Sequence, residues 1–126
     1  MTESNVREYS AHAASTHTFG RVLANARDHY LVVDGPVQNG CPGEALTPAE
    51  LFLAGVASCG VELVGVLAKA EGISLARIAV DIKGTIDRSR PVRADVSLFN
   101  SVHVHFRMQG VSRQQGDFLV GRFKAR

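Results

Sequence analysis

The most prominent pattern in the sequence is an apolar run from Leu51 to Leu67 in which Glu62 is the only charged side chain. At the helical period its apolar residues face every direction, so the helix must be covered on all sides. The run is about 17 residues long, the short limit for a membrane span, and it also contains Ser58 and three glycines. We therefore expect a buried helix of a soluble protein.

Local signals mark both ends of this helix. Thr47 is suited to cap the first free N–H groups, and Pro48 suits the first helical position. Glu50 lies three residues after Thr47, the spacing at which its side chain returns the capping bond. Gly72, with Lys69 in the last turn, predicts the end of the helix.

Strands are predicted before the helix. Segments 9–14 and 29–33 are β-prone, and the region between them contains the turn-forming residues Gly20, Asn25 and Asp28. This arrangement predicts two or three antiparallel strands. A loop rich in glycine and proline then carries Cys41 and leads into the helix.

A second region of strands follows the helix. Apolar and polar residues alternate over 78–86 and again over 96–108, which predicts a hairpin joined by a turn at 87–91. A last helix is expected from Ser112, because Gln115 has the spacing of a second capping box, and its pattern continues to the end of the sequence.

Composition narrows the class of protein. The 126 residues are 45% hydrophobic and 21% charged, which is typical of a single globular domain, here residues 1–126. A net charge of +2 demands neither a nucleic-acid partner nor a membrane partner. The polar start of the chain has no apolar signal segment, so we expect a cytoplasmic protein whose thiols are mostly reduced.

Cys59 is the first candidate for chemistry. It lies about 16 Å along the helix from Pro48, beyond the reach of the helix dipole, and burial raises the pKa of a thiol. A reactive Cys59 therefore needs a cation from elsewhere in the fold, and an arginine is the expected source. Glu62, one turn later, opposes thiolate formation unless an arginine bridges both groups. The structural alternative is an inert thiol that packs as a small apolar side chain.

Other charged or ligating residues have simpler interpretations. His103 and His105 look like a metal pair, but alternate residues of a strand share a face by geometry. A metal site needs three or four ligands, so we expect solvent-facing histidines and no metal. A basic turn is expected to be solvated, with nucleic-acid binding as a weaker hypothesis. It contains Arg88, Arg90 and Arg93.

The long helix also raises the question of oligomeric state. A few strands and one short helix offer too little apolar surface to cover it on every side. The small residues Ala54, Gly55 and Ser58 would let another backbone come close. A homodimer in which two such helices pack together is the simplest solution.

Residues 46–59 read Leu-Thr-Pro-Ala-Glu-Leu-Phe-Leu-Ala-Gly-Val-Ala-Ser-Cys. This stretch resembles the central-helix signature of the family of osmotically inducible protein C (OsmC) and organic hydroperoxide resistance protein (Ohr). In that signature an acid and a leucine follow the proline, and the cysteine lies on a later turn of the helix. The resemblance implies an α+β fold, with antiparallel β-sheets packed around a long buried central helix and an intertwined homodimer. It also implies a thiol peroxidase that acts on small organic hydroperoxides without metal or organic cofactor.

The same resemblance suggests roles for particular residues. Cys59 would be the nucleophile, and Arg21, which follows a glycine in the early strands, is the nearest match to the activating arginine. In the Ohr-type pattern the acid that holds this arginine directly follows the proline, whereas here Ala49 takes that position and the acid is Glu50. This shift is the pattern of the OsmC-like branch. A substrate pocket of apolar side chains would lie beside the thiol, formed by Phe52, Gly55 and Val56.

The resemblance implies a second cysteine at the end of the last helix, where this sequence has none. Three explanations are open: the chain is truncated within that helix, Cys41 is the resolving thiol, or an external thiol or dithiol reduces Cys59 directly. For Cys41 to bond to Cys59, their Cα atoms must come within about 6 Å. The alternative to an enzyme is an inactive dimer of the same fold that binds a small apolar ligand or has a structural role.

Overall fold

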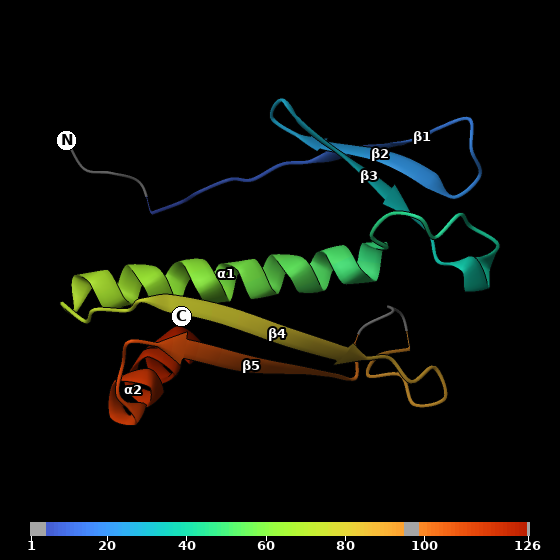
Figure 1. The fold of residues 1–126 in the computed structure, drawn as a ribbon. Helices are drawn as coiled ribbons and strands as arrows, with labels where there is room; N and C mark the ends of the chain where they lie inside the picture. Colours follow the sequence, from blue (N-terminus) through green and yellow to red (C-terminus); the bar gives the residue numbers. More distant parts are fainter. Residues whose placement is uncertain (1–4, 95–98, 126) are drawn as a thin grey trace. The chain divides into compact units, whose positions relative to one another are not determined.

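The computed structural model describes residues 5–94 and 99–125, and the chain has the expected α+β composition (Figure 1). It divides into two compact units, unit 1 over residues 1–51 and unit 2 over residues 52–126. Unit 1 contains a three-stranded sheet, a short 3-10 helix (Val37–Asn39) and the start of the long helix. Unit 2 contains the rest of that helix, a two-stranded sheet and a second helix.

The sheet of unit 1 is antiparallel in the order β1 (His12–Ser15), β2 (Arg21–Ala26) and β3 (His29–Asp34). The expectation of a turn at Asn25 is wrong, because Asn25 lies within β2 opposite Tyr30. The chain instead reverses after Ala26, where Arg27 has a positive φ of 54°. The Asn25 amide donates to the carbonyl of Arg27 at 3.4 Å, so it supports the turn from the strand.

The long helix α1 spans Pro48–Ala70, within the predicted bounds. Its capping box is confirmed: the Glu50 N–H donates to Thr47 Oγ1 at 3.3 Å, and the Thr47 N–H donates to Glu50 Oε1 at 3.0 Å. At the other end Gly72 has a φ of +67°, a conformation that a glycine adopts without strain. The predicted end of the helix is therefore also confirmed.

Unit 2 is built on the antiparallel hairpin of β4 (Arg77–Thr85) and β5 (Ser101–Gln109). The second helix, α2 (Arg113–Lys124), begins with the predicted capping box of Ser112 and Gln115. Residues 96 and 98, which the alternating pattern assigns to the second strand, lie outside the described residues.

The core of unit 2 joins both helices to the apolar face of this hairpin. Its buried members are Val64, Leu67 and Ala68 of α1 and Leu119 of α2. Partly buried side chains from the rest of the unit pack against them: Ile73, Leu75, Ile78, Phe106, Met108 and Phe123. At Gly60 an added Cβ would lie 3.3 Å from the Phe106 ring, so this glycine lets α1 approach the sheet closely.

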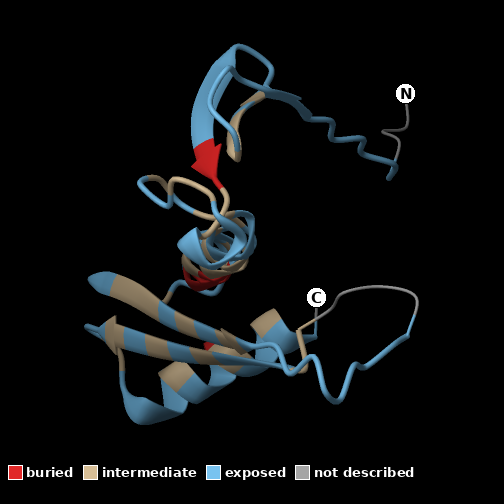
Figure 2. Ribbon diagram, turned by 90° about the vertical axis from the view of Figure 1, so that its right-hand side faces the viewer, coloured by how far each residue is buried: buried red, intermediate tan, exposed pale blue. Residues whose placement is uncertain are grey.

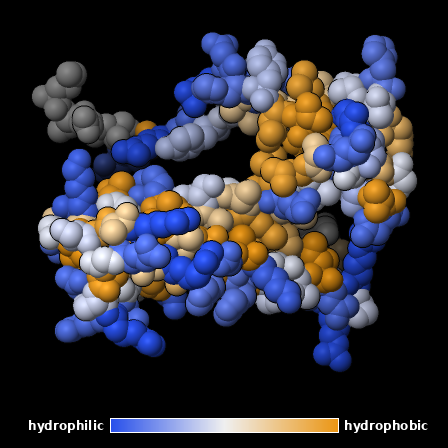
Figure 3. All heavy atoms as spheres, viewed as in Figure 1, coloured by the Kyte–Doolittle hydropathy of each residue, from blue (hydrophilic) through white to orange (hydrophobic). Residues whose placement is uncertain are grey.

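Unit 2 leaves the opposite side of α1 uncovered. Exposed residues recur at helical spacing along it: Phe52, Gly55, Cys59, Glu62 and Val66. Figure 2 shows how little of the helix is buried, and in Figure 3 apolar side chains are visible along the row that α1 occupies in Figure 1. By length and composition α1 is the one helix in the described part of the chain that could cross a membrane, and only 22% of its most apolar stretch is buried. Unit 2 by itself therefore does not provide the predicted all-round cover.

Candidate functional site

Cys59 is an exposed free thiol near the middle of α1. It lies on the uncovered side of the helix, where Phe52 and Gly55 precede it and Glu62 follows one turn later. An added Cβ at Gly55 would meet no atom within 4 Å. Open space therefore adjoins the helix one turn before the thiol.

The residues expected to form an apolar pocket are only partly assembled within unit 2. Phe52 is 59% exposed, and its ring stacks on Phe99 at a centroid distance of 5.8 Å. Val56 is half-buried. Within the described part of unit 2, the Cys59 sulfur makes no hydrogen bond or ion pair.

Arg21 lies in a cluster of ionic hydrogen bonds at one end of the sheet of unit 1. Its Nε donates to Asp34 Oδ1 at 2.8 Å, and its Nη2 donates to Asp34 Oδ2 at 2.9 Å. The same Nη2 also donates to Glu44 Oε1 at 2.8 Å. Two strands and the loop before α1 thus meet at one guanidinium.

Asp34 is the buried centre of this cluster, with no exposed side-chain surface. Its Oδ2 also accepts the backbone N–H groups of Glu44 at 2.9 Å and Ala45 at 3.0 Å. The hydrogen bond from Arg21, followed by these two backbone bonds, lowers the pKa of Asp34 from 3.8 to about 2, against the opposing effect of burial. The same pairing raises the pKa of Arg21, which stays charged at every physiological pH.

Glu50, the predicted partner of Arg21, is bonded elsewhere in unit 1. Its carboxylate accepts the N–H and the hydroxyl of Thr47, both at 3.0 Å, and these bonds lower its pKa. This is the geometry of a helix cap. Neither Asp34 nor Glu44 has a local signal in the sequence: Asp34 directly follows the β-prone segment 29–33 and precedes Gly-Pro, and Glu44 lies in the loop rich in glycine and proline.

Cys41 occupies a niche between two glycines of unit 1. An added Cβ at either Gly20 or Gly35 would lie 2.5 Å from the Cys41 sulfur, so neither position has room for a side chain. The Gly35 N–H donates to the Gly20 carbonyl at 2.8 Å and closes the niche. The thiol is free and half-buried. The two glycines against which it packs are the sequence neighbours of Arg21 and Asp34.

Arg21 and Cys41 belong to unit 1, whereas Cys59 belongs to unit 2. The ion pair between Arg21 and Cys59, and the disulfide between Cys41 and Cys59, therefore stay predictions.

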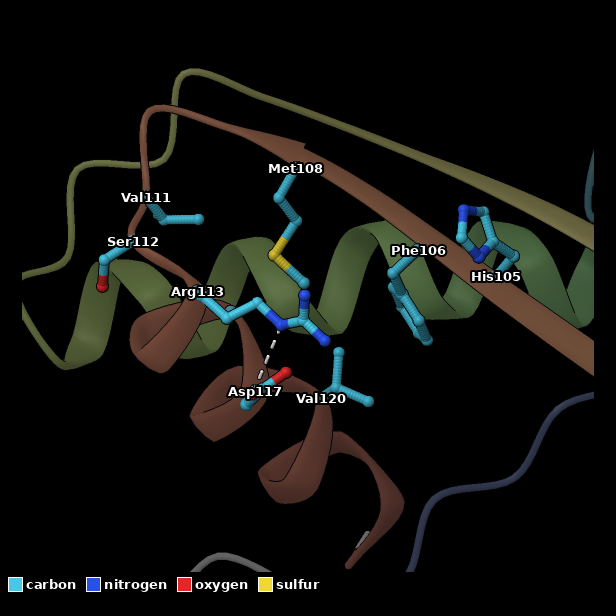
Figure 4. Close-up of a pocket in the computed structure, with 9 residues that line it drawn as sticks. His105, Phe106, Met108, Val111, Ser112, Arg113, Asp117 and Val120 are labelled. Atoms are coloured by element: carbon cyan, nitrogen blue, oxygen red, sulfur yellow. Dashed lines mark ion pairs between the residues drawn. The ribbon is translucent and has the colours of Figure 1, made fainter.

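A groove in unit 2 lies between β5 and α2 (Figure 4). Phe106, Met108 and Val120 contribute apolar side chains to it, and Arg113 and Asp117 form a loose ion pair of 3.8 Å beside them. Its lining contains no cysteine. It is thus separate from the thiol that sequence analysis selected.

The outer face of the β4–β5 hairpin is polar. His103 and His105 are exposed there, opposite Lys83 and Asp81 respectively. No group of three or more His, Cys, Asp or Glu side chains in the described residues is arranged to hold a metal ion. Arg88 and Arg90 are exposed in the turn that follows β4.

The fold and the site place this chain in a class of proteins. They have an α+β fold, two antiparallel sheets and a long helix with a cysteine near its middle. The sequence profile of the family described as OsmC-like protein matches residues 41–117, which include α1 and Cys59. This chain therefore belongs to the OsmC-like family. No match was found among curated proteins.

Solved structures share the fold. An OsmC-like protein from Mycoplasma pneumoniae is 15% identical with a TM-score of 0.81, over 95% of this chain and 82% of that one. An organic hydroperoxide resistance protein OsmC from Legionella pneumophila is 23% identical with a TM-score of 0.70, over 94% and 82%. An organic hydroperoxide resistance protein from Elizabethkingia anophelis is 18% identical with a TM-score of 0.72, over 94% and 82%. At these identities the likeness establishes the fold.

Proposed function

We propose that this protein is a thiol peroxidase that reduces small organic hydroperoxides in the cytoplasm, with Cys59 as its nucleophile. The observation that carries the proposal is the exposed free thiol of Cys59 on the uncovered side of α1, within the part of the chain that matches the family. Two of the similar structures are named as organic hydroperoxide resistance proteins, which favours this substrate class.

The reaction needs Cys59 as a thiolate, because the thiolate is the nucleophilic form of cysteine. The sulfur attacks the terminal oxygen of the hydroperoxide, an S–O bond forms and the O–O bond breaks. The alkoxide takes up a proton and leaves as an alcohol, and Cys59 becomes a sulfenic acid. A thiol then displaces water to form a disulfide, and a second thiol reduces that disulfide. Neither metal nor organic cofactor takes part in these steps.

Arg21 is the proposed activating cation, and the similarity to the family is the reason for choosing it. Because its guanidinium is held by carboxylates, it is fixed in position as well as charged. Cys41 is the candidate resolving thiol within the chain, and an external thiol or dithiol is the candidate otherwise. Phe52, Gly55 and Val56 would contribute the apolar side of the substrate pocket.

The proposed assembly is a homodimer. The uncovered side of α1 includes Phe52 and Val66, which are 59% and 50% exposed in the single chain. A second copy would cover this apolar surface without a membrane, and the charge of Glu62 on the same side disfavours contact with lipid. Apolar surface of this kind is typical of an interface.

Turnover of cumene hydroperoxide with dithiothreitol tests the function. Cys59→Ser is expected to abolish turnover, because serine cannot form the sulfenic acid. Cys41→Ser is the matched control, and it should retain turnover since dithiothreitol can resolve Cys59 directly. Equal turnover in the Cys59→Ser variant and the natural sequence would refute the peroxidase.

One observation favours a second candidate, an inactive dimer that binds a small apolar ligand or has a structural role. The Cys59 sulfur has no cationic partner in the described residues of its own unit. This candidate predicts a Cys59 that maleimide labels only after unfolding. Labelling of the folded protein within minutes would exclude it.

A further inference from the structure

We propose that Asp34 is the positioning residue that orients Arg21 for its action on Cys59, the role that the family pattern gives to an acid at the start of α1. The inference rests on the proposed function, because it assumes that Arg21 activates the thiol. It concerns a residue to which the sequence pattern gave no chemical role.

The geometry of unit 1 supports this role. Asp34 meets Arg21 through two parallel hydrogen bonds of 2.8 and 2.9 Å, an arrangement that fixes the plane of a guanidinium as well as its position. The carboxylate is fully buried, whereas Glu44, the other acid on Arg21, is 76% exposed. A hydrogen bond to a solvated side chain constrains its partner much less.

Asp34 also connects Arg21 to the start of α1. Its side chain accepts the N–H groups of Glu44 and Ala45, and its own N–H donates to the Leu46 carbonyl at 3.0 Å. These three residues directly precede the cap residue Thr47. One buried residue therefore sets both the orientation of the arginine and the path of the chain into the helix that carries the thiol.

A neutral amide cannot replace this carboxylate. Oδ2 accepts three hydrogen bonds and Oδ1 accepts one. If the NH₂ of an asparagine takes the place of Oδ2, it faces three donors. If the NH₂ takes the place of Oδ1, it faces the Arg21 Nε–H. Either orientation leaves buried donors opposed and without acceptors.

The competing acid is Glu50, and the two assignments predict different variants. The Glu50 carboxylate is bonded to Thr47, so Glu50→Gln should weaken the helix cap without moving Arg21. Asp34→Asn should release Arg21. Asp87→Asn is the matched control, because Asp87 is an exposed aspartate that accepts hydrogen bonds from Ser89 in a turn of unit 2.

The experiment measures the rate at which iodoacetamide alkylates Cys59 from pH 4 to 9 in a Cys41→Ser background, with urea unfolding as a check on folding. We expect Asp34→Asn to lower the alkylation rate at pH 6 about tenfold, since one pH unit in the thiolate midpoint corresponds to that factor. Arg21→Gln should have the same effect, and the double variant no further effect. Glu50→Gln and Asp87→Asn should keep the natural profile. A natural profile for Asp34→Asn, with a shifted one for Glu50→Gln, would overturn the proposal.

A measurement on the natural protein distinguishes the orientation of Arg21 by Asp34 from the activation of Cys59 by Arg21. The Arg21 Nε–H should give a resolved NMR signal that is protected from exchange with water. Asp34→Asn should abolish this protection. Glu44→Gln should largely preserve it, and this variant serves as the test if Asp34→Asn does not fold. If the natural protein shows no protected Nε–H signal, Asp34 is refuted as the residue that orients Arg21. A protected signal, together with a natural alkylation profile in Arg21→Gln, would instead refute the activating role in the proposed function.

Discussion

Asp34 and Arg21 illustrate how a small sheet holds a buried charge. Burial of a carboxylate is unfavourable unless its oxygens are hydrogen-bonded. Here all four hydrogen bonds come from strand β2 and the loop before α1. The result is a pKa lowered to about 2 for Asp34 and a defined path for the loop.

This lowered pKa predicts how stability depends on pH. A carboxyl group whose pKa is lower in the folded state stabilises that state above its ordinary pKa, and the stabilisation is lost as the pH falls through the folded value. The stability advantage of the natural protein over Asp34→Asn should therefore be constant above about pH 4 and shrink as the pH falls to about 2. Urea unfolding of both proteins at pH 7, 4, 3 and 2 measures it. An advantage that does not change with pH would contradict this assignment.

Among the elements, α1 and the β4–β5 hairpin depend on close packing at Gly60. The helix lies near the sheet because this residue has no side chain, and the Phe106 ring and Val80 occupy the space beyond it. Interiors of this density have little room for added atoms.

Gly60→Val should therefore destabilise the protein by about 1–3 kcal/mol, the usual effect of overpacking a core. Gly121→Val is the control, because an added Cβ at Gly121 on α2 meets no atom within 4 Å. Its effect should be much smaller, and the comparison of urea midpoints measures the difference. Equal effects of the two substitutions would show that α1 does not pack on the hairpin at Gly60.

For the whole molecule, the main open feature is the side of α1 that unit 2 leaves uncovered. Buried α1 residues lie on the side that meets the hairpin, while Phe52, Cys59 and Val66 are exposed. An apolar side of this length, continuous with the candidate thiol, links the proposed dimer to the proposed chemistry.

The proposed dimer can be tested without an activity assay. Light scattering at micromolar concentration should give twice the 13.5 kDa of one chain. Val66→Arg should shift the protein toward the monomer, because it places a charge in the apolar interface. Val92→Arg is the matched control, since Val92 is 58% exposed in the loop that follows β4 and Val66 is 50% exposed on α1. A monomeric natural protein would refute the proposed assembly.

The sequence by itself determined the elements whose signals are local. The capping boxes of Thr47 and Ser112, the long apolar run of α1 and the alternation in β4 and β5 all depend on neighbours within a few residues. For the same reason the family signature around Cys59 could be recognised directly.

Only the tertiary structure decided which acid holds Arg21. Asp34 is thirteen residues from Arg21 in sequence, and the two meet because β2 and β3 pair with Arg21 opposite Asp34. The sequence pattern pointed to Glu50 and gave Asp34 no role, because the residue opposite Arg21 cannot be identified while the strand register is unknown. Charge pairing depends on that register, and the register is set by contacts between distant residues.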